Sequence, residues 1–113
     1  MYKRLTLFRR KRGMSQEEFK RHWGEHRSMA ADVPGLRRFV LNYIQSEPFG
    51  RPGVEDWDIG PTDGIAETWW DSETSYQQAL ETPELKRWYA HGASFIGQQK
   101  TYCIWVKVTD SCV

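Results

Sequence analysis

The order of strand-like and helix-like segments constrains the fold of this chain more than any other feature of its sequence. Alternating stretches rich in β-branched and aromatic residues predict strands, whereas apolar residues at helical spacing predict helices. In the order strand, helix, strand, strand, helix, strand, these segments cover residues 2–8, 16–31, 36–44, 64–70, 72–89 and 101–108. This βαββαβ order is the split βαβ pattern, which predicts an α+β fold with both helices on one face of an antiparallel four-stranded sheet.

The length of the chain and the apolar character of its strands predict one domain that pairs with a second copy. A chain of 113 residues is long enough for one hydrophobic core and too short for two, so we expect a single domain over residues 1–113. The sheet face without helices would expose Trp, Ile and Val side chains, which is unfavourable in water. We therefore expect a homodimer in which this face is covered.

The first helix has a clear start and a single apolar stripe. Ser15 followed by Glu18 is the capping-box pattern of a helix N-terminus. Beyond it, the spacing that marks one buried face runs through Phe19, Trp23, His26 and Ala30. We therefore expect His26 to point toward the sheet. An enclosed imidazole can accept and donate a proton, although a buried histidine can also be held in a core by hydrogen bonds alone.

Two irregular segments separate the predicted elements. The basic run Arg9–Arg12 is interpreted as a solvated turn after the first strand. The longest irregular stretch, Ser46–Asp63, is rich in Pro and Gly and contains Phe49 and Trp57. Loops of this length in a compact domain are usually either functional or disordered, and we expect this one to cover a ligand pocket as a lid.

Charge and motif content exclude several classes of function. Lys and Arg total 16 against 15 Asp and Glu, so the chain has no net field that would attract nucleic acid or an anionic membrane. It has no phosphate-binding glycine loop, and Cys103 and Cys112 form neither a C-x-x-C pair nor part of a zinc motif. The N-terminus has no apolar signal core and no apolar run could span a bilayer. We expect a cytoplasmic protein without nucleic-acid, membrane or metal partners.

Several motifs resemble the EthD-like family of dimeric α/β-barrel proteins, within which the closest likeness is to the 4-methylmuconolactone methylisomerases. The resemblance covers nearly the whole chain and rests on residues 11–19 (KRGMSQEEF), 22–26 (HWGEH), 34–36 (PGL), 63–67 (DGIAE) and 88–98 (WYAHGASFIGQ). It implies a ferredoxin-like fold, a homodimer, no metal or organic cofactor, and a pocket between sheet and helices. It also implies that the histidine of the first helix, His26, handles protons.

The same resemblance indicates which residues accompany His26. It implies a tyrosine on the second strand and a cysteine on the third, and the matching positions here hold Phe39 and Thr68. Tyr43 lies on the same strand face as Phe39, about two pleats along, and could supply a displaced phenol. We therefore predict His26, Tyr43 and Thr68 as the catalytic residues.

Aromatic and apolar residues on the predicted inner faces are candidates for the walls of the pocket. The predicted substrate-binding residues are Trp23, Phe39, Leu41, Trp70, His91 and Phe95, although large aromatics at such spacing are often simply core. His91 could instead cap a helix end, and His22 is interpreted as a surface residue. For Glu67, within a strand, we expect a structural pairing with an arginine or a strand-edge amide and favour this over a role as general base.

These observations predict a cofactor-independent isomerase or lyase that acts on a small lactone or aromatic-derived metabolite by proton transfer through His26. Two alternatives remain at this point. One is a polyketide cyclase, dehydratase or decarboxylase, and the other is a non-catalytic protein that binds a small metabolite in the same pocket. The fold alone does not decide among them.

Overall fold

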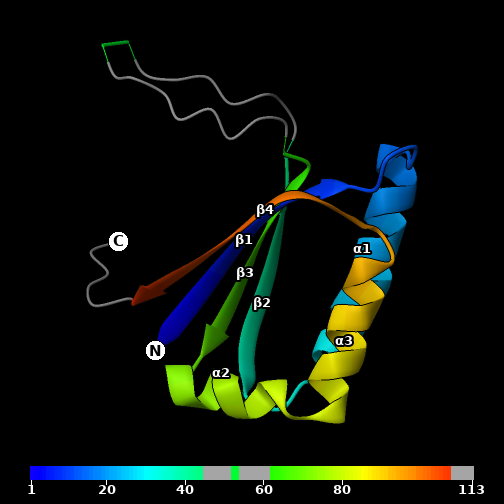
Figure 1. The fold of residues 1–113 in the computed structure, drawn as a ribbon. Helices are drawn as coiled ribbons and strands as arrows, with labels where there is room; N and C mark the ends of the chain where they lie inside the picture. The colour runs from blue at the N-terminus through cyan, green and yellow to red at the C-terminus, as the bar shows by residue number, and fades with distance from the viewer. Residues whose placement is uncertain (45–51, 54–61, 108–113) are drawn as a thin grey trace.

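The computed structural model describes residues 1–44, 52–53 and 62–107, except for the side chains of residues 98–104. Within these described residues, seven elements follow one another (Figure 1): β1 (Tyr2–Arg10), α1 (Gln16–Ala30), β2 (Leu36–Tyr43), β3 (Gly64–Trp70), α2 (Glu73–Leu80), α3 (Pro83–Ala93) and β4 (Ile96–Lys107). Most of the predicted lid Ser46–Asp63, with Phe49 and Trp57, lies outside the described residues. The predicted element order is confirmed, with the second helical region divided into α2 and α3.

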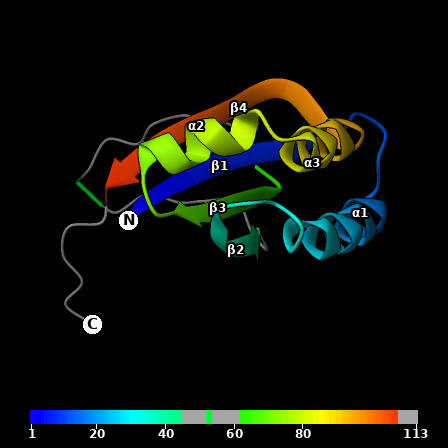
Figure 2. The ribbon, with the colours of Figure 1, turned by 90° about the horizontal axis from the view of Figure 1, so that it is seen from below.

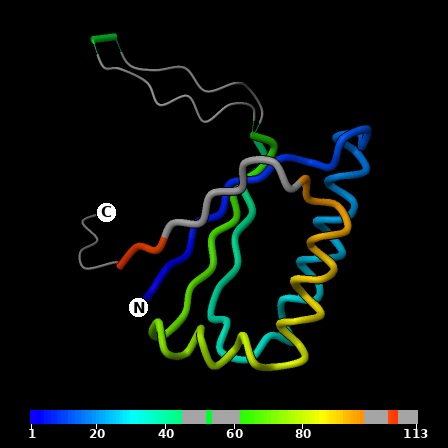
Figure 3. Tube along the Cα trace, in the orientation of Figure 1, coloured from blue at the N-terminus to red at the C-terminus, as the bar shows by residue number. Residues whose placement is uncertain are grey.

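The sheet has the strand order β2-β3-β1-β4, and all its described pairings are antiparallel. The three helices cover one face: α1 and α3 run side by side, and α2 crosses one end of the sheet (Figure 2). The Cα trace turns back from α3 into the start of β4 (Figure 3), and β4 pairs with β1. This is the ferredoxin-like arrangement, as the sequence predicts.

Each helix begins at a side chain that caps its first turn. The Ser15 hydroxyl accepts a hydrogen bond from the Glu18 backbone N–H at 3.1 Å, and Ser72 and Thr82 cap α2 and α3 in the same way. Pro83 follows Thr82 at the first turn of α3, where its missing N–H would be unpaired in any residue. Substituting such a cap by Ala typically costs about 1 kcal/mol of stability.

Among the side chains that the structure describes, two groups of buried residues form the core between the sheet and the helices. One contains Val33, Trp70, Tyr76, Ala79, Leu85 and Trp88. The other contains Phe8, Phe19, Trp23, Ala66 and Phe95. Fully burying a side chain such as Leu or Phe contributes about 1.5–3 kcal/mol, so these groups anchor α1 and α3 to the sheet.

Strands β1 and β4 are longer than the sequence predicts. Arg9 and Arg10 pair with Gly97 and Ile96 after a register shift in β1, so the interpretation of Arg9 and Arg10 as part of a turn is wrong. The first residues of β4 were missed because Gly97 looks like a break in the pattern. A Cβ at Gly97 would lie only 2.8 Å from the Arg10 carbonyl oxygen, so glycine is what allows the strands to approach here.

The sheet face opposite the helices combines apolar side chains with paired charges. Glu67 accepts from Lys3 at 2.6 Å and from the Asn42 side chain at 2.9 Å, which confirms a structural pairing, although the partners are not the expected arginine or strand-edge amide. Lys3 and Arg38 both lie over the Trp69 ring, 4.7 and 4.9 Å from its centroid.

No helix in the described part of the chain is long and apolar enough to cross a membrane.

Candidate active site

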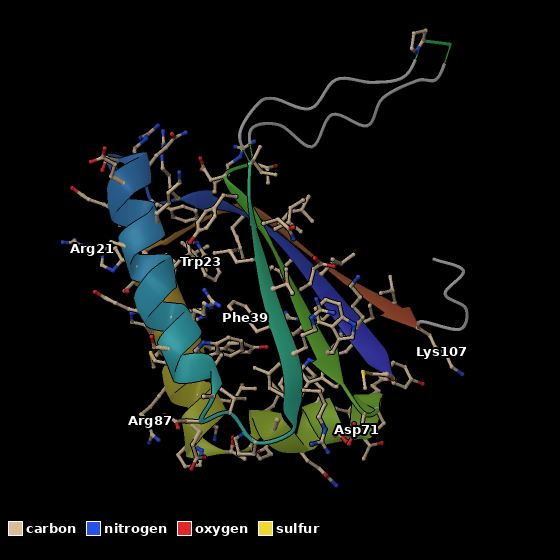
Figure 4. The ribbon with its side chains drawn as sticks, turned by 180° about the vertical axis from the view of Figure 1, so that it is seen from behind. Arg21, Trp23, Phe39, Asp71, Arg87 and Lys107 are labelled. Atoms are coloured by element: carbon tan, nitrogen blue, oxygen red, sulfur yellow. The ribbon has the colours of Figure 1, made fainter. Side chains whose placement is uncertain are left out.

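A cavity of about 370 Å³ lies between the sheet and helices α1 and α3. Trp23 from α1 and Phe39 from β2 both point into the space between helix and sheet (Figure 4), with ring centroids 6.0 Å apart. The residues that line the cavity are Arg4, Thr6, Phe8, Trp23, His26, Phe39, Ala66, Thr68, Trp88, Tyr89, Gly92, Ala93 and Ile96. A largely apolar cavity with a few convergent polar groups is the usual form of a small-molecule site.

His26 lies on the sheet-facing side of α1 and lines this cavity, as the spacing of the helix predicts. Its ring stacks on the indole of Trp88, with centroids 4.7 Å apart and planes 11° from parallel. The Trp88 Nε1–H also donates to the His26 carbonyl oxygen at 2.9 Å. Helix α3 therefore holds both the ring and the backbone of His26 in place.

A second histidine contacts His26 on the side of Nδ1. The Nδ1 atoms of His26 and His91 are 3.0 Å apart, so one ring donates a proton and the other accepts it. Nε2 is then the ring nitrogen of His26 that can meet a ligand. A Cβ at Gly92 would lie 3.3 Å from the His26 Cε1 and 3.8 Å from its Nε2, so the missing side chain lets the imidazole approach α3 closely.

His26 is only 5% exposed, and its surroundings favour the neutral ring. Burial, and to a lesser extent the charge of His91, lowers the pKa of His26 from 6.5 to about 3. The imidazole is thus neutral and able to accept a proton at physiological pH, provided that its unprotonated nitrogen faces the ligand.

Arg4 supplies a positive charge to the same cavity. Its Nη1 donates to the phenol oxygen of Tyr89 at 2.9 Å, and that phenol shares a hydrogen bond of 2.5 Å with the phenol of Tyr76. The guanidinium also lies 5.4 Å from the ring centroid of Tyr76 and 5.7 Å from that of Tyr89. This cluster joins β1 to α2 and α3 and gives the cavity a cationic, hydrogen-bonding wall.

Thr68 contributes a hydroxyl from β3. The indole Nε1–H of Trp70 donates to its Oγ1 at 2.9 Å, in a part of the core where Thr68 is 7% exposed and Trp70 is fully buried. A hydroxyl that accepts one hydrogen bond still has its own proton to donate. Trp70 is therefore a partner that orients Thr68, and it does not line the cavity wall as predicted.

The structure brings only part of the predicted site together. Of the predicted residues, His26, Thr68, Trp23 and Phe39 line the cavity, and Tyr43, Leu41, Trp70, His91 and Phe95 do not. Leu41 and Phe95 belong to the core around Phe19, and His91 lies beside His26 rather than capping a helix end.

Tyr43 is the clearest departure from the prediction. It pairs with Gly64 at one end of β2, whereas Phe39 pairs with Thr68, and four residues of strand span about 13 Å. Its side chain is 38% exposed, and the Lys20 ammonium lies 5.5 Å from its ring centroid. The phenol that lines the cavity belongs to Tyr89 from α3, not to Tyr43.

Sequence reasoning did not select Arg4 and Tyr89, although a signal for Arg4 was present. Arg4 alternates with Thr6 and Phe8 and so shares the strand face that points to the helices. Tyr89 depends on how α3 packs against β1, which no local pattern reveals.

Comparison with known proteins shows the family of this chain. A profile of the methylmuconolactone methyl-isomerase family matches residues 1–110. The chain belongs to this family. It is also 34% identical over 102 residues to the 4-carboxymethyl-4-methylbutenolide mutase of Pseudomonas reinekei, covering 90% of this chain and 94% of that protein. The prediction of an isomerase is confirmed by this membership.

Solved structures with the same fold are more distant in sequence. An EthD family protein of Bacillus halodurans is 21% identical, with a TM-score of 0.72 and coverage of 95% of this chain and 97% of that chain. A protein of Bacteroides fragilis, described as dimeric and ferredoxin-like, is 13% identical, with a TM-score of 0.63 and coverage of 94% of each chain. These likenesses confirm the predicted fold.

Proposed function

We propose that this protein isomerises a small lactone that carries a carboxylate, with His26 as the group that removes and returns a proton. The observation that supports this most is the composition of one cavity: a neutral, enclosed imidazole and the guanidinium of Arg4 line the same space of about 370 Å³. Such a pair suits an anionic substrate that must lose a proton from carbon. Thr68 completes the proposed catalytic set, and no cofactor takes part.

Arg4 is the proposed anchor for the substrate carboxylate. A guanidinium presents its N–H donors in a planar fork that matches a carboxylate. In the free protein one of these donors is held by the Tyr89 phenol, which fixes the direction of the side chain. The Pseudomonas reinekei relative is named for 4-carboxymethyl-4-methylbutenolide, a lactone with a carboxymethyl group on the ring carbon that bears the ring oxygen.

Proton transfer at the carbon next to that carboxylate accounts for an isomerisation. His26 Nε2 takes a proton from this carbon, the electrons of the C–H bond form a C=C bond, and the lactone C–O bond breaks to release the ring oxygen as a second carboxylate. The original carboxylate then closes a new lactone by adding to a different carbon of the substrate. At the same time His26 returns its proton to the substrate carbon next to the newly released carboxylate. All atoms and electrons of the substrate are retained, so no redox group is needed.

The hydroxyl of Thr68 is the proposed donor to the oxygen that gains charge during ring opening. Its Oγ1 already accepts from Trp70, so its own proton is free to point at a ligand. The new carboxylate also stabilises the imidazolium form of His26, because an opposite charge raises the pKa of a histidine. The low pKa that burial gives His26 therefore does not prevent proton abstraction.

A homodimer formed through the exposed sheet face completes the proposal. Trp69, Val40 and Leu5 lie on this face, and the Bacteroides fragilis neighbour of the same fold is described as dimeric. Sedimentation at micromolar concentration should give twice the mass of one chain, 13.3 kDa.

The proposal is tested by following 4-carboxymethyl-4-methylbutenolide by proton NMR in D₂O with the purified protein. We expect conversion to an isomer with solvent deuterium incorporated next to a carboxylate. His26→Gln should lower turnover by about 10²–10⁴-fold, the usual share of a positioned acid or base. Tyr43→Phe is the matched control and should leave turnover unchanged, because its phenol does not line the cavity.

Two results would contradict the proposal. If the lactone bound without being converted, the cavity would be a binding site only. If His26→Gln kept normal turnover per folded molecule, the proton would be carried by another group. Arg4→Gln separates anchoring from chemistry, since it should raise KM more than it lowers kcat.

A further inference from the structure

We propose that His22, Glu25 and His91 form a binding site for a divalent metal ion, Zn²⁺ in particular, beside His26 and outside the cavity. One ligand atom from each of these three side chains lies within 4.8 Å of the other two. This site goes beyond the proposed isomerase chemistry, in which none of the three residues touches the substrate. The chain folds so that α1 supplies two of the ligands and α3 the third.

The distances around Glu25 approach those of a metal-bound set. Glu25 Oε2 lies 3.7 Å from His22 Nδ1 and 3.5 Å from His91 Nε2. Zinc binds histidine nitrogen and carboxylate oxygen at about 2.0–2.2 Å, so two ligands of a tetrahedral ion are separated by about 3.4 Å. Small movements of the exposed Glu25 side chain would complete this geometry.

The environment of His22 Nδ1 is a second, independent indication of a metal site. Its Nδ1 is buried and has no hydrogen-bond partner among the described residues. The ring cannot turn away at little cost, because it stacks on Phe95 with centroids 5.4 Å apart and planes 7° from parallel. An unpaired buried nitrogen costs free energy, and a metal ion would satisfy it.

His91 is held in the orientation that a metal ligand requires. Its Nδ1 contacts the Nδ1 of His26 at 3.0 Å, while its Nε2 faces Glu25. Histidines that bind a metal through one nitrogen usually direct the other ring N–H at an acceptor, which fixes the ring. Two imidazoles and one carboxylate suit Zn²⁺ rather than Ca²⁺ or Mg²⁺, which prefer oxygen ligands. The exposed side of Glu25 leaves room for a water as fourth ligand.

Metal binding would select one tautomer of His26, a consequence that rests on the proposed function. With a metal on Nε2, His91 must donate its Nδ1–H to His26 Nδ1. The proton of the neutral His26 ring is then on Nε2, the atom that we expect to meet the substrate. In this form His26 can no longer begin the reaction by accepting a proton there, so zinc should inhibit turnover.

The direct test is calorimetric titration of chelator-treated protein with ZnCl₂. We expect one zinc per chain with micromolar or tighter affinity. His22→Phe keeps the stacking on Phe95 and removes the nitrogen, and Glu25→Gln removes the charge, so each should weaken binding by about tenfold or more. Glu17→Gln, which changes an exposed carboxylate of the same helix, is the control and should leave the affinity unchanged.

NMR of ¹⁵N-histidine-labelled protein gives a readout that does not need activity. Zinc should shift the His91 Nε2 signal to that of a metal-bound nitrogen and place the His26 proton on Nε2. The site is refuted if zinc binds weaker than millimolar, or if binding survives both His22→Phe and Glu25→Gln. Zinc binding without inhibition would retain the metal site and contradict the assigned role of His26, so the two proposals fail separately.

Discussion

Acidification from pH 7 to pH 5 should destabilise this protein by about 2 kcal/mol through His26 alone. Burial holds the pKa of this histidine at about 3 in the folded chain, against 6.5 for an ordinary histidine. Between these two values the unfolded chain binds a proton that the folded chain excludes, so the free energy of unfolding falls as the pH falls. Each pH unit well below 6.5 costs about 1.4 kcal/mol, and the onset near 6.5 reduces the total to about 2 kcal/mol at pH 5.

The charged groups that surround His26 do not reverse this sign. His91 faces it from α3 at 3.0 Å and lowers its pKa further, and Arg4 lines the same cavity as a second cation. The paired carboxylate of Glu67 affects the free energy of unfolding over a lower pH range. Lys3 and Asn42 hold the pKa of Glu67 below its usual 4.5, so the stability that this group contributes is lost only below that pH.

The assay is urea unfolding of chelator-treated protein at pH 7 and pH 5, at one protein concentration, for the native chain and His26→Gln. The other two histidines are present in both proteins, so the difference between the proteins isolates His26. We expect the native chain to lose about 2 kcal/mol more than the variant between the two pH values. Equal losses would show that His26 is not kept neutral by burial, and the reasoning would be wrong.

Further predictions concern the surroundings of His26. Gly92→Ala should lower turnover about tenfold, because the new Cβ would press on the His26 ring at 3.3 Å, while thermal unfolding changes little since Ala favours a helix. Tyr89→Phe should weaken substrate binding by about 1 kcal/mol through loss of its hydrogen bond to Arg4, as read by calorimetry. An absorption spectrum of the purified protein should show no flavin or haem. Trp69→Lys should shift sedimentation toward the monomer by placing charge on the exposed sheet face.

Local sequence patterns are sufficient to predict most of the helices and strands and their order. The capping residue Ser15 and the stripe through Phe19, Trp23 and His26 lie where helical spacing and capping predict, because both depend on neighbours within one or two turns. Local patterns fail where one residue type fits two structures, as glycine does, because it can end a strand or allow two strands to approach closely. Gly97 looked like a break and is instead the point at which β4 approaches Arg10 closely.

The parts of the site that sequence reasoning missed depend on contacts between distant segments. Arg4 meets Tyr89 only because β1 lies beneath α3, and His91 meets His26 only because α3 packs beside α1. Tyr43 shares a strand face with Phe39, which supports the prediction, but it lies two pleats farther along β2 and outside the cavity that His26 lines. Two residues line the same cavity only if they lie on the same face of the sheet and close to each other. The alternation of side chains along a strand determines the face and not the distance.

The attachment of His26 to α3 separates the position of the proposed proton-transfer group from the strand residues that line the cavity. The indole of Trp88, the ring of His91 and the open position at Gly92 all belong to one stretch of α3, and all three contact His26. The sheet contributes an edge-to-face contact from Phe39, with ring centroids 6.1 Å apart, and no polar contact to the imidazole among the described residues. Replacing polar residues on β2 or β3 would therefore change which substrate groups are held without moving the imidazole. The position of Phe39 should accordingly determine substrate preference, whereas the last turns of α3 should determine whether any proton transfer occurs.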